Sequence, residues 1–161
     1  MPYQPDVRVM PALMKLHECL CAELERSGLG DNCDCALVHG GADNVAPPAV
    51  GRGYAWLALQ SIYPSKEFPG ATAGLDSCPA PLAATITVGL IRCYAVKARG
   101  ESSEEMLVYM DKQMADMAAM RRAIVCCNNE FDLAMGIYSP IGPSGGIYGG
   151  QWVVTVGQSL G

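Results

Sequence analysis

The last third of the chain constrains the fold most strongly, because a helix there is followed by two strands and by no further helix. A helical pattern that ends at about Cys127 precedes two strand-like segments, residues 131–138 and 151–158. Residues 140–150 lie between them and are rich in glycine, as a turn requires. A helix followed by a two-stranded ribbon offers β-strand edges and few catalytic groups, which is typical of assembly proteins rather than of enzymes.

The rest of the chain alternates helical and strand-like patterns. The segments are an amphipathic helix at 10–27, strands at 35–39, 54–63 and 82–96, and a helix that Ser102 and Glu105 begin as a capping box. Strands joined by turns pair antiparallel, and two helices suffice to cover one face of such a sheet. We therefore predict one α+β domain over residues 1–161, with a mostly antiparallel sheet, two helices on one face and the order α-β-β-β-α-β-β. An irregular arm at 1–9 and a long loop at 64–81 complete it.

Helical spacing predicts which side chains the two helices bury. In the first helix these are Met10, Leu13, Met14, His17, Leu20, Cys21 and Leu24, and in the second Leu107, Met110, Met114, Met117, Ile124 and Val125. Arg121 and Arg122 either cap the end of the second helix in solvent, or Arg121 lies half buried against a carboxylate of a neighbouring subunit.

The charge and hydropathy of the chain exclude several kinds of partner. The net charge is −5 and the pI about 4.9, so the chain lacks the clustered Lys and Arg with which proteins grip nucleic-acid phosphates. No run of about 18 uncharged apolar residues occurs, and the first residues lack the basic and apolar regions of a signal peptide. We therefore expect a protein that folds in a cytoplasm and has no membrane partner.

One segment matches a catalytic pattern by its letters alone. Residues 142–146, Gly-Pro-Ser-Gly-Gly, fit the G-x-S-x-G pattern of hydrolase nucleophiles. That nucleophile needs a helix after it and a histidine later in the chain, whereas here a strand follows and both histidines, His17 and His39, lie upstream. A turn that requires glycine is the better interpretation. We expect no enzymatic activity and no catalytic residues, with a hydrolase at Ser144 as an alternative.

Eight cysteines are many for a cytoplasmic chain of this length. The candidates that could bind a metal are Cys33, Cys35, Cys19, Cys21 and His17. Helical residues two apart point about 200° from each other, and C-x-C is less typical of zinc than longer spacings, so structural thiols are favoured. Cys126 and Cys127 lie at a helix end, where packing or a late disulfide in an assembled particle is favoured over catalysis. No cofactor is expected, and a metal-binding module at Cys33 and Cys35 is an alternative.

A few aromatic and basic side chains are candidates for contacts with partners. Core packing is the default for Trp152, whereas Tyr148 lies at the tip of a glycine turn and has less reason to be buried. The candidate interaction residues are Phe68, Arg121, Arg122, Tyr138, Tyr148 and Trp152.

Several segments together resemble a known family. The helix that opens with residues 11–14 and ends with 19–24, the stretch 116–127, the turn 142–146 and the strand entry 149–152 carry the likeness, together with the length and the order of elements. In these respects the chain resembles the tail-terminator proteins of long-tailed actinobacterial phages, which are also called tail-completion or head–tail joining proteins. A neighbouring neck component, such as a stopper or adaptor, is the alternative within the same machinery.

The resemblance implies a structural virion protein without a cofactor. It implies a homohexameric ring that caps the tail tube, stops tube growth and joins the tail to the head connector. The implied partners are further copies of the chain, the major tail tube protein and a head-completion, stopper or connector protein, while DNA passes through the channel without specific binding. The protein would reside in the host cytoplasm during assembly and in the neck of the mature particle.

Three expectations about assembly accompany this interpretation. Exposed sheet edges at residues 82–96 and 151–158 would form the contacts between subunits. The loop at 64–81 would be disordered when free and would become fixed on contact with the tube. An acidic lumen would repel DNA phosphates, so that DNA slides instead of sticking.

Overall fold

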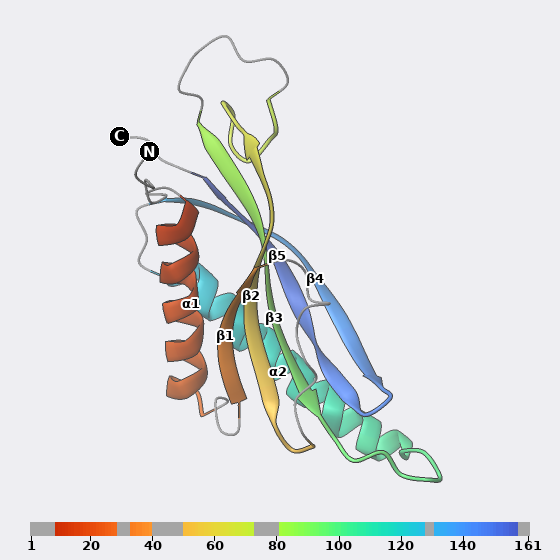
Figure 1. Ribbon diagram of the computed structural model, residues 1–161. Helices are drawn as coiled ribbons and strands as arrows, with labels where there is room; N and C mark the ends of the chain where they lie inside the picture. Colours follow the sequence, from red (N-terminus) through yellow and green to blue (C-terminus); the bar gives the residue numbers. More distant parts are fainter. Residues whose placement is uncertain (1–8, 29–32, 40–49, 73–80, 128–130, 158–161) are drawn as a thin grey trace.

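The computed structural model describes residues 9–28, 33–39, 50–72, 81–127 and 131–157, which form an α+β fold (Figure 1). In chain order the elements are α1 (Val9–Arg26), β1 (Cys33–His39), β2 (Gly53–Pro64), β3 (Leu82–Cys93), α2 (Ser103–Val125), β4 (Asp132–Ser144) and β5 (Ile147–Gly157). The predicted class and the order α-β-β-β-α-β-β are confirmed. Among the described residues, neither helix has the length and apolar character needed to cross a lipid bilayer.

The sheet has the strand order β1-β2-β3-β5-β4, and every pair is antiparallel except β1 with β2. That parallel pair differs from the expectation that turn-connected strands are antiparallel. Its register runs from Cys33 opposite Gly53 to His39 opposite Leu59, so the chain must return along the length of β1 before β2 begins. The free edges of the sheet are therefore β1 and β4. The expectation of edges at residues 82–96 and 151–158 is wrong, because β3 and β5 lie inside the sheet.

Both helices pack against the sheet and against each other. In Figure 1, α2 runs diagonally behind the strands and α1 stands beside β1. The side chains between the helices and the sheet form one apolar core, whose largest members include Leu13, Leu16, Leu20, Leu57, Ile86, Leu90, Met120, Ile124 and Val154. Alternate residues of β3 enter this core, as the period of a strand requires.

The buried face of α2 differs from the predicted stripe. The buried residues are Gln113, Asp116, Ala119, Met120, Ala123 and Ile124, whereas Leu107, Met110, Met114 and Val125 are exposed. Of the predicted set only Ile124 is fully buried, and Met117 is half buried. Alanines on the inner face let the helix approach the sheet closely, and its two polar side chains find partners there. Ser102 accepts the backbone N–H of Glu105 at 3.2 Å, so the predicted N-cap is confirmed.

The stripe predicted for α1 is only partly correct. Leu13, Leu20 and Leu24 are buried, but Met10 and Met14 are 42% and 60% exposed. Ala12 and Leu16 are buried in their place, because the contact with α2 and the sheet is centred one residue away from the predicted stripe.

The hairpin between β4 and β5 has a shorter turn than the sequence indicated. Gly145 and Gly146 alone form it, with φ values of 58° and 84° that favour glycine in a two-residue turn. The strands therefore continue to Ser144 on one side and from Ile147 on the other. The glycine turn predicted for residues 142–146 is confirmed only at Gly145 and Gly146, because residues 142–144 belong to β4, and a strand rather than a helix follows the turn.

The described part of the long loop, residues 64–72, holds its own hydrogen bonds. The hydroxyl of Ser65 donates to the carbonyl of Gly70 at 2.6 Å, and the backbone N–H of Lys66 donates to the Thr72 hydroxyl at 2.8 Å. This ordered turn differs from the expectation of a loop that orders only on contact. The remaining residues of that loop, 73–80, lie outside the described part, as do residues 40–49 and residues 1–8 of the predicted arm, whereas Val9 already belongs to α1.

Candidate functional site

The most exposed apolar surface of α2 lies along one flank of the helix. Leu107, Met110 and Met114 are 59%, 48% and 43% exposed, and their spacing of three and four residues places them in one row. We call these three residues the outer row. Apolar side chains gathered in this way are typical of a surface that another protein covers.

The edge strand β4 is the second unpaired surface. It pairs only with β5, and its Ile137 is 75% exposed. Register shifts between Met135 and Tyr138 and between Ile141 and Ser144 interrupt the ladder. Such irregularities, together with the prolines that this strand carries, limit uncontrolled pairing along an edge. The opposite edge, β1, belongs to the other side of the sheet, so the two edges can meet only in different copies of the chain.

A buried ion pair fixes the position of α2 on the sheet. Arg92 of β3 contacts both carboxylate oxygens of Asp116, with Nε–Oδ2 at 2.7 Å and Nη2–Oδ1 at 2.9 Å. Asp116 is 1% exposed. Three residues earlier on α2, the Gln113 amide donates to carbonyl oxygens of the β4–β5 hairpin at Ile141, Gly142 and Gly149. These contacts direct the polar side of α2 inward and thereby leave the outer row exposed.

A pocket of about 490 Å³ opens beside this ion pair. Its aromatic wall is a stack in which the ring of Tyr109 lies 4.3 Å from that of Tyr94 and 5.3 Å from that of Tyr148. Arg92 and Arg52 also line it, but both form ion pairs with carboxylates, the latter with Asp34 at 3.2 Å. The charges of the two arginines are therefore compensated, whereas Lys112, which also lines the pocket, is exposed.

Tyr148 is buried, contrary to the expectation from its place in the sequence. It is 5% exposed and lies in β5 opposite Arg92 of β3. The turn is confined to Gly145 and Gly146, so Tyr148 belongs to the strand instead of the turn tip. Burial raises the pKa of its hydroxyl.

Tyr138 and Trp152 lie side by side under α2. Their ring centroids are 5.3 Å apart, and the Trp152 indole N–H donates to the carbonyl of Met117 at 3.2 Å. Trp152 is thus half buried and packs against the core, in line with its default interpretation. The Tyr138 hydroxyl is buried and has no hydrogen-bond partner among the described residues. Desolvation, followed by the nearby Asp116 carboxylate, raises the pKa of Tyr138 to about 12.

Tyr138→Phe should leave the stability at neutral pH unchanged or raise it by up to about 1 kcal/mol, because it removes a buried hydroxyl without a partner. In the wild type, the folded state resists ionisation of Tyr138 while the unfolded chain ionises near its ordinary pKa of about 10. The folded state is therefore fully stable with respect to this group below about pH 10. Between about pH 10 and pH 12 the free energy of unfolding falls by roughly 2–3 kcal/mol, because the unfolded chain releases the Tyr138 proton first. Urea unfolding at several pH values should show a smaller alkaline loss for the variant.

Tyr63→Phe is the matched control for this substitution. The Tyr63 hydroxyl donates to the carbonyl of Pro69 at 2.6 Å, so its removal should cost about 0.5–1.5 kcal/mol at neutral pH. Equal destabilisation by the two substitutions would mean that the Tyr138 hydroxyl is hydrogen-bonded after all.

The remaining predicted contact residues are dispersed over the molecule. Arg121 is exposed and forms no ion pair with any described residue. Arg122 donates to Glu23 at 3.0 Å and so ties α2 to α1. Phe68 lies at the far end of the sheet, where its ring covers Gly157 so closely that no Cβ would fit there. The six candidates therefore form no single site.

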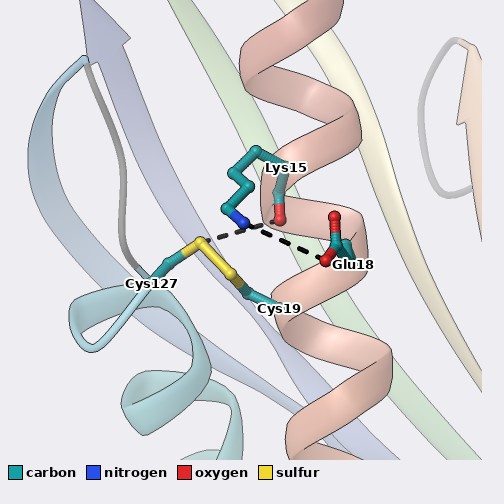
Figure 2. Close-up of a disulfide and its surroundings, with 4 residues drawn as sticks. All are labelled: Lys15, Glu18, Cys19 and Cys127. Atoms are coloured by element: carbon teal, nitrogen blue, oxygen red, sulfur yellow. Dashed lines mark hydrogen bonds and ion pairs between the residues drawn. A yellow bond between two sulfur atoms is a disulfide. The ribbon is translucent and has the colours of Figure 1, made fainter.

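The cysteines join α1 to two different elements. Cys19 forms a disulfide with Cys127 beyond the end of α2, as Figure 2 shows, and Cys21 forms one with Cys35 of β1. The two α1 cysteines thus point in different directions, as their helical positions predicted. Cys33, Cys93 and Cys126 are free thiols among the described residues. Burial raises the pKa of the Cys33 thiol.

Sequence reasoning missed Gln113 and Asp116, whose buried contacts position α2, and it missed Ile137, which is itself exposed on the edge strand. A usable signal existed for Asp116, because Ala119 and Ala123 follow it at helical spacing and mark a face that approaches the sheet closely. Among the described residues, one group has the geometry to hold a metal ion, namely His17, Cys21 and Cys35. All three were candidates from the sequence, but only Cys35 belongs to the pair, Cys33 and Cys35, that was named as the alternative metal site.

Comparisons with known proteins leave the function to be argued from this geometry. No protein-family model matches the chain, and no functionally curated protein matches it.

Proposed function

We propose that this protein is a ring-forming structural component of a phage neck, a tail terminator that caps the tail tube and joins it to the head connector. The observation that carries the proposal is the outer row of α2, Leu107, Met110 and Met114, held outward by the buried contacts of the opposite side. The sequence resemblance suggests which assembly the chain forms, a ring on a tail tube. The outer row is the surface through which neighbouring subunits would contact each other.

The outer row suits the centre of a subunit contact. Burying a side chain of this size completely contributes about 1.5–3 kcal/mol, and these three are roughly half exposed in one chain. A stable contact buries about 800 Å² on each partner, so the row needs neighbouring surface as well. Exposed Ile137 on the edge strand β4 adds apolar area of the same kind.

The two sheet edges favour a head-to-tail contact. In a closed ring each subunit presents one surface to its neighbour on one side and a different surface on the other side. The edges β1 and β4 lie at opposite ends of the strand order, which suits such an arrangement. A ring would also cover edges that are otherwise a liability for aggregation. Copies of this acidic chain around a channel would let DNA pass without binding it tightly.

A double substitution in the outer row, Leu107→Ser with Met114→Ser, tests the proposal. Each change removes about 1–2 kcal/mol of apolar burial per contact, so ring formation should weaken roughly thirtyfold or more. Native mass spectrometry of the wild type, alone and with tail tube protein, should give a six-subunit ring that the variant no longer forms. Tubes assembled in its presence should stop growing with the wild type and continue with the variant.

Met14→Ser is the matched control, because Met14 is 60% exposed on α1 and far from the outer row along the chain. It should leave both the ring and the melting temperature unchanged. A wild type that stays monomeric with tube protein would contradict the proposal. Rings that bind only a head connector and ignore tubes would instead identify a stopper or adaptor.

A further inference from the structure

Three metal-ligating side chains meet where α1 packs on β1. His17 and Cys21 lie four residues apart on α1 and therefore on the same face of the helix. Cys35 reaches them from β1. The ligand atoms of all three residues lie within 4.8 Å of one another, and His17 Nε2 is 3.5 Å from Cys21 Sγ.

These distances suit a tetrahedral zinc ion. With Zn–S near 2.3 Å and Zn–N near 2.0 Å, a tetrahedron separates sulfur from nitrogen by ~3.5 Å and the two sulfurs by ~3.8 Å. The nitrogen–sulfur distance already has this value. The two sulfurs are bonded to each other in the oxidised protein and must separate, which rotation of the side chains can provide because the Cα atoms lie 5.9 Å apart. All three side chains are partly exposed, so an ion can reach them.

We infer that the reduced protein binds one zinc ion through His17, Cys21 and Cys35, and that oxidation to the Cys21–Cys35 disulfide releases it. The neutral imidazole and two thiolates supply three ligands, and a water molecule completes the tetrahedron. Soft thiolates with an imidazole select zinc over magnesium or calcium.

The exchange between the two forms balances in electrons and protons. A dithiol reductant gives two electrons and two protons to the Cys21–Cys35 bond, which becomes two thiols while the reductant becomes a disulfide. Zinc then displaces one proton from each thiol, so binding releases two protons. In the reverse direction an oxidant of the disulfide class takes two electrons from the thiolates, the S–S bond forms again and zinc leaves.

The consequence is a link between α1 and β1 in both redox states. In a reducing cytoplasm disulfides are rare, and zinc would hold the two elements together there. Outside the cell the disulfide would take over the same link. The site is independent of ring formation, because all three of its residues belong to one chain and none lies in the outer row.

The test compares zinc content in the two redox states of the full chain. Protein reduced with a phosphine, which is not a thiol, is equilibrated with zinc, desalted and examined by native mass spectrometry. We expect one zinc ion per reduced chain and none per oxidised chain. His17→Ala and Cys35→Ser should each lose the ion, whereas Cys33→Ser and Cys126→Ser, the free-thiol controls, should keep it.

Cobalt substitution gives a readout that does not depend on variants that fold poorly. Reduced wild type loaded with Co²⁺ should show tetrahedral visible bands and sulfur-to-cobalt charge transfer with the intensity of two thiolates. Three outcomes would overturn the inference: reduced protein without zinc, zinc binding that survives His17→Ala, or loss of zinc in Cys126→Ser with retention in Cys35→Ser.

Discussion

Asp116→Ala should lower the free energy of unfolding by about 3–5 kcal/mol, because it leaves the Arg92 guanidinium without its buried carboxylate partner. Asp116 is 1% exposed, and Arg92 is only 16% exposed along its side chain, so water in the adjoining pocket replaces the lost oxygens only in part. Urea unfolding at neutral pH, with both variant and wild type followed by circular dichroism, measures the change.

Two further variants distinguish the effect of losing the ion pair from the effect of removing any carboxylate from α2. Asp111→Ala removes an exposed carboxylate from the same helix and should change stability by less than about 0.5 kcal/mol. Arg92→Met combined with Asp116→Ala should cost much less than the sum of the single changes, since each single change removes one member of the bidentate pair and leaves the other without that counter-charge. Additive losses in this double-mutant cycle would mean that the two side chains act independently, contrary to the bidentate geometry.

The same ion pair explains why the buried face of α2 could not be predicted from the sequence. Hydrophobic spacing selects Leu107, Met110 and Met114, and by that criterion alone they belong in the core. The actual inner face carries Asp116 and Gln113, whose partners come from β3 and from the β4–β5 hairpin. Periodicity within a helix contains no information about a guanidinium on a distant strand.

Features that depend on neighbouring residues were predictable. The N-cap at Ser102 and the glycine turn at Gly145 and Gly146 follow from local chemistry, and both are present. The α+β class follows from the order of the elements. The parallel pairing of β1 with β2 and the position of β4 at the edge arise from how distant segments are arranged, which local patterns do not specify.

Cysteine pairing is another property that spacing could not supply. Helical geometry showed that Cys19 and Cys21 diverge, but the partners Cys127 and Cys35 are set by how α1 packs on α2 and β1. Cys127 is bonded to Cys19 within the single chain, while Cys126 is an exposed free thiol, and a disulfide that forms late in an assembled particle stays a prediction.

Cys127→Ser should lower the stability of the oxidised protein by about 2–4 kcal/mol, because the Cys19–Cys127 bond closes a loop of 108 residues. A crosslink over a long loop removes more conformational freedom from the unfolded chain than the Cys21–Cys35 bond, which spans 14 residues. Differential scanning calorimetry should show a melting temperature lower by roughly 5–15 °C. Figure 2 places the bond between α1 and Cys127, two residues beyond the end of α2 at Val125, so its loss also frees the helix end.

Cys126→Ser is the matched control, because it tests whether Cys126 rather than Cys127 is bonded to Cys19. Cys126 is the exposed neighbour of Cys127, and peptide mapping cannot easily distinguish which of two adjacent cysteines is linked to Cys19. The substitution should leave the melting temperature of the oxidised protein unchanged. Full reduction should bring the wild type down to the level of Cys127→Ser or below, since it opens both disulfides. If Cys126→Ser proved as destabilising as Cys127→Ser, the link would use the other sulfur, and the end of α2 would have to turn to present it to α1.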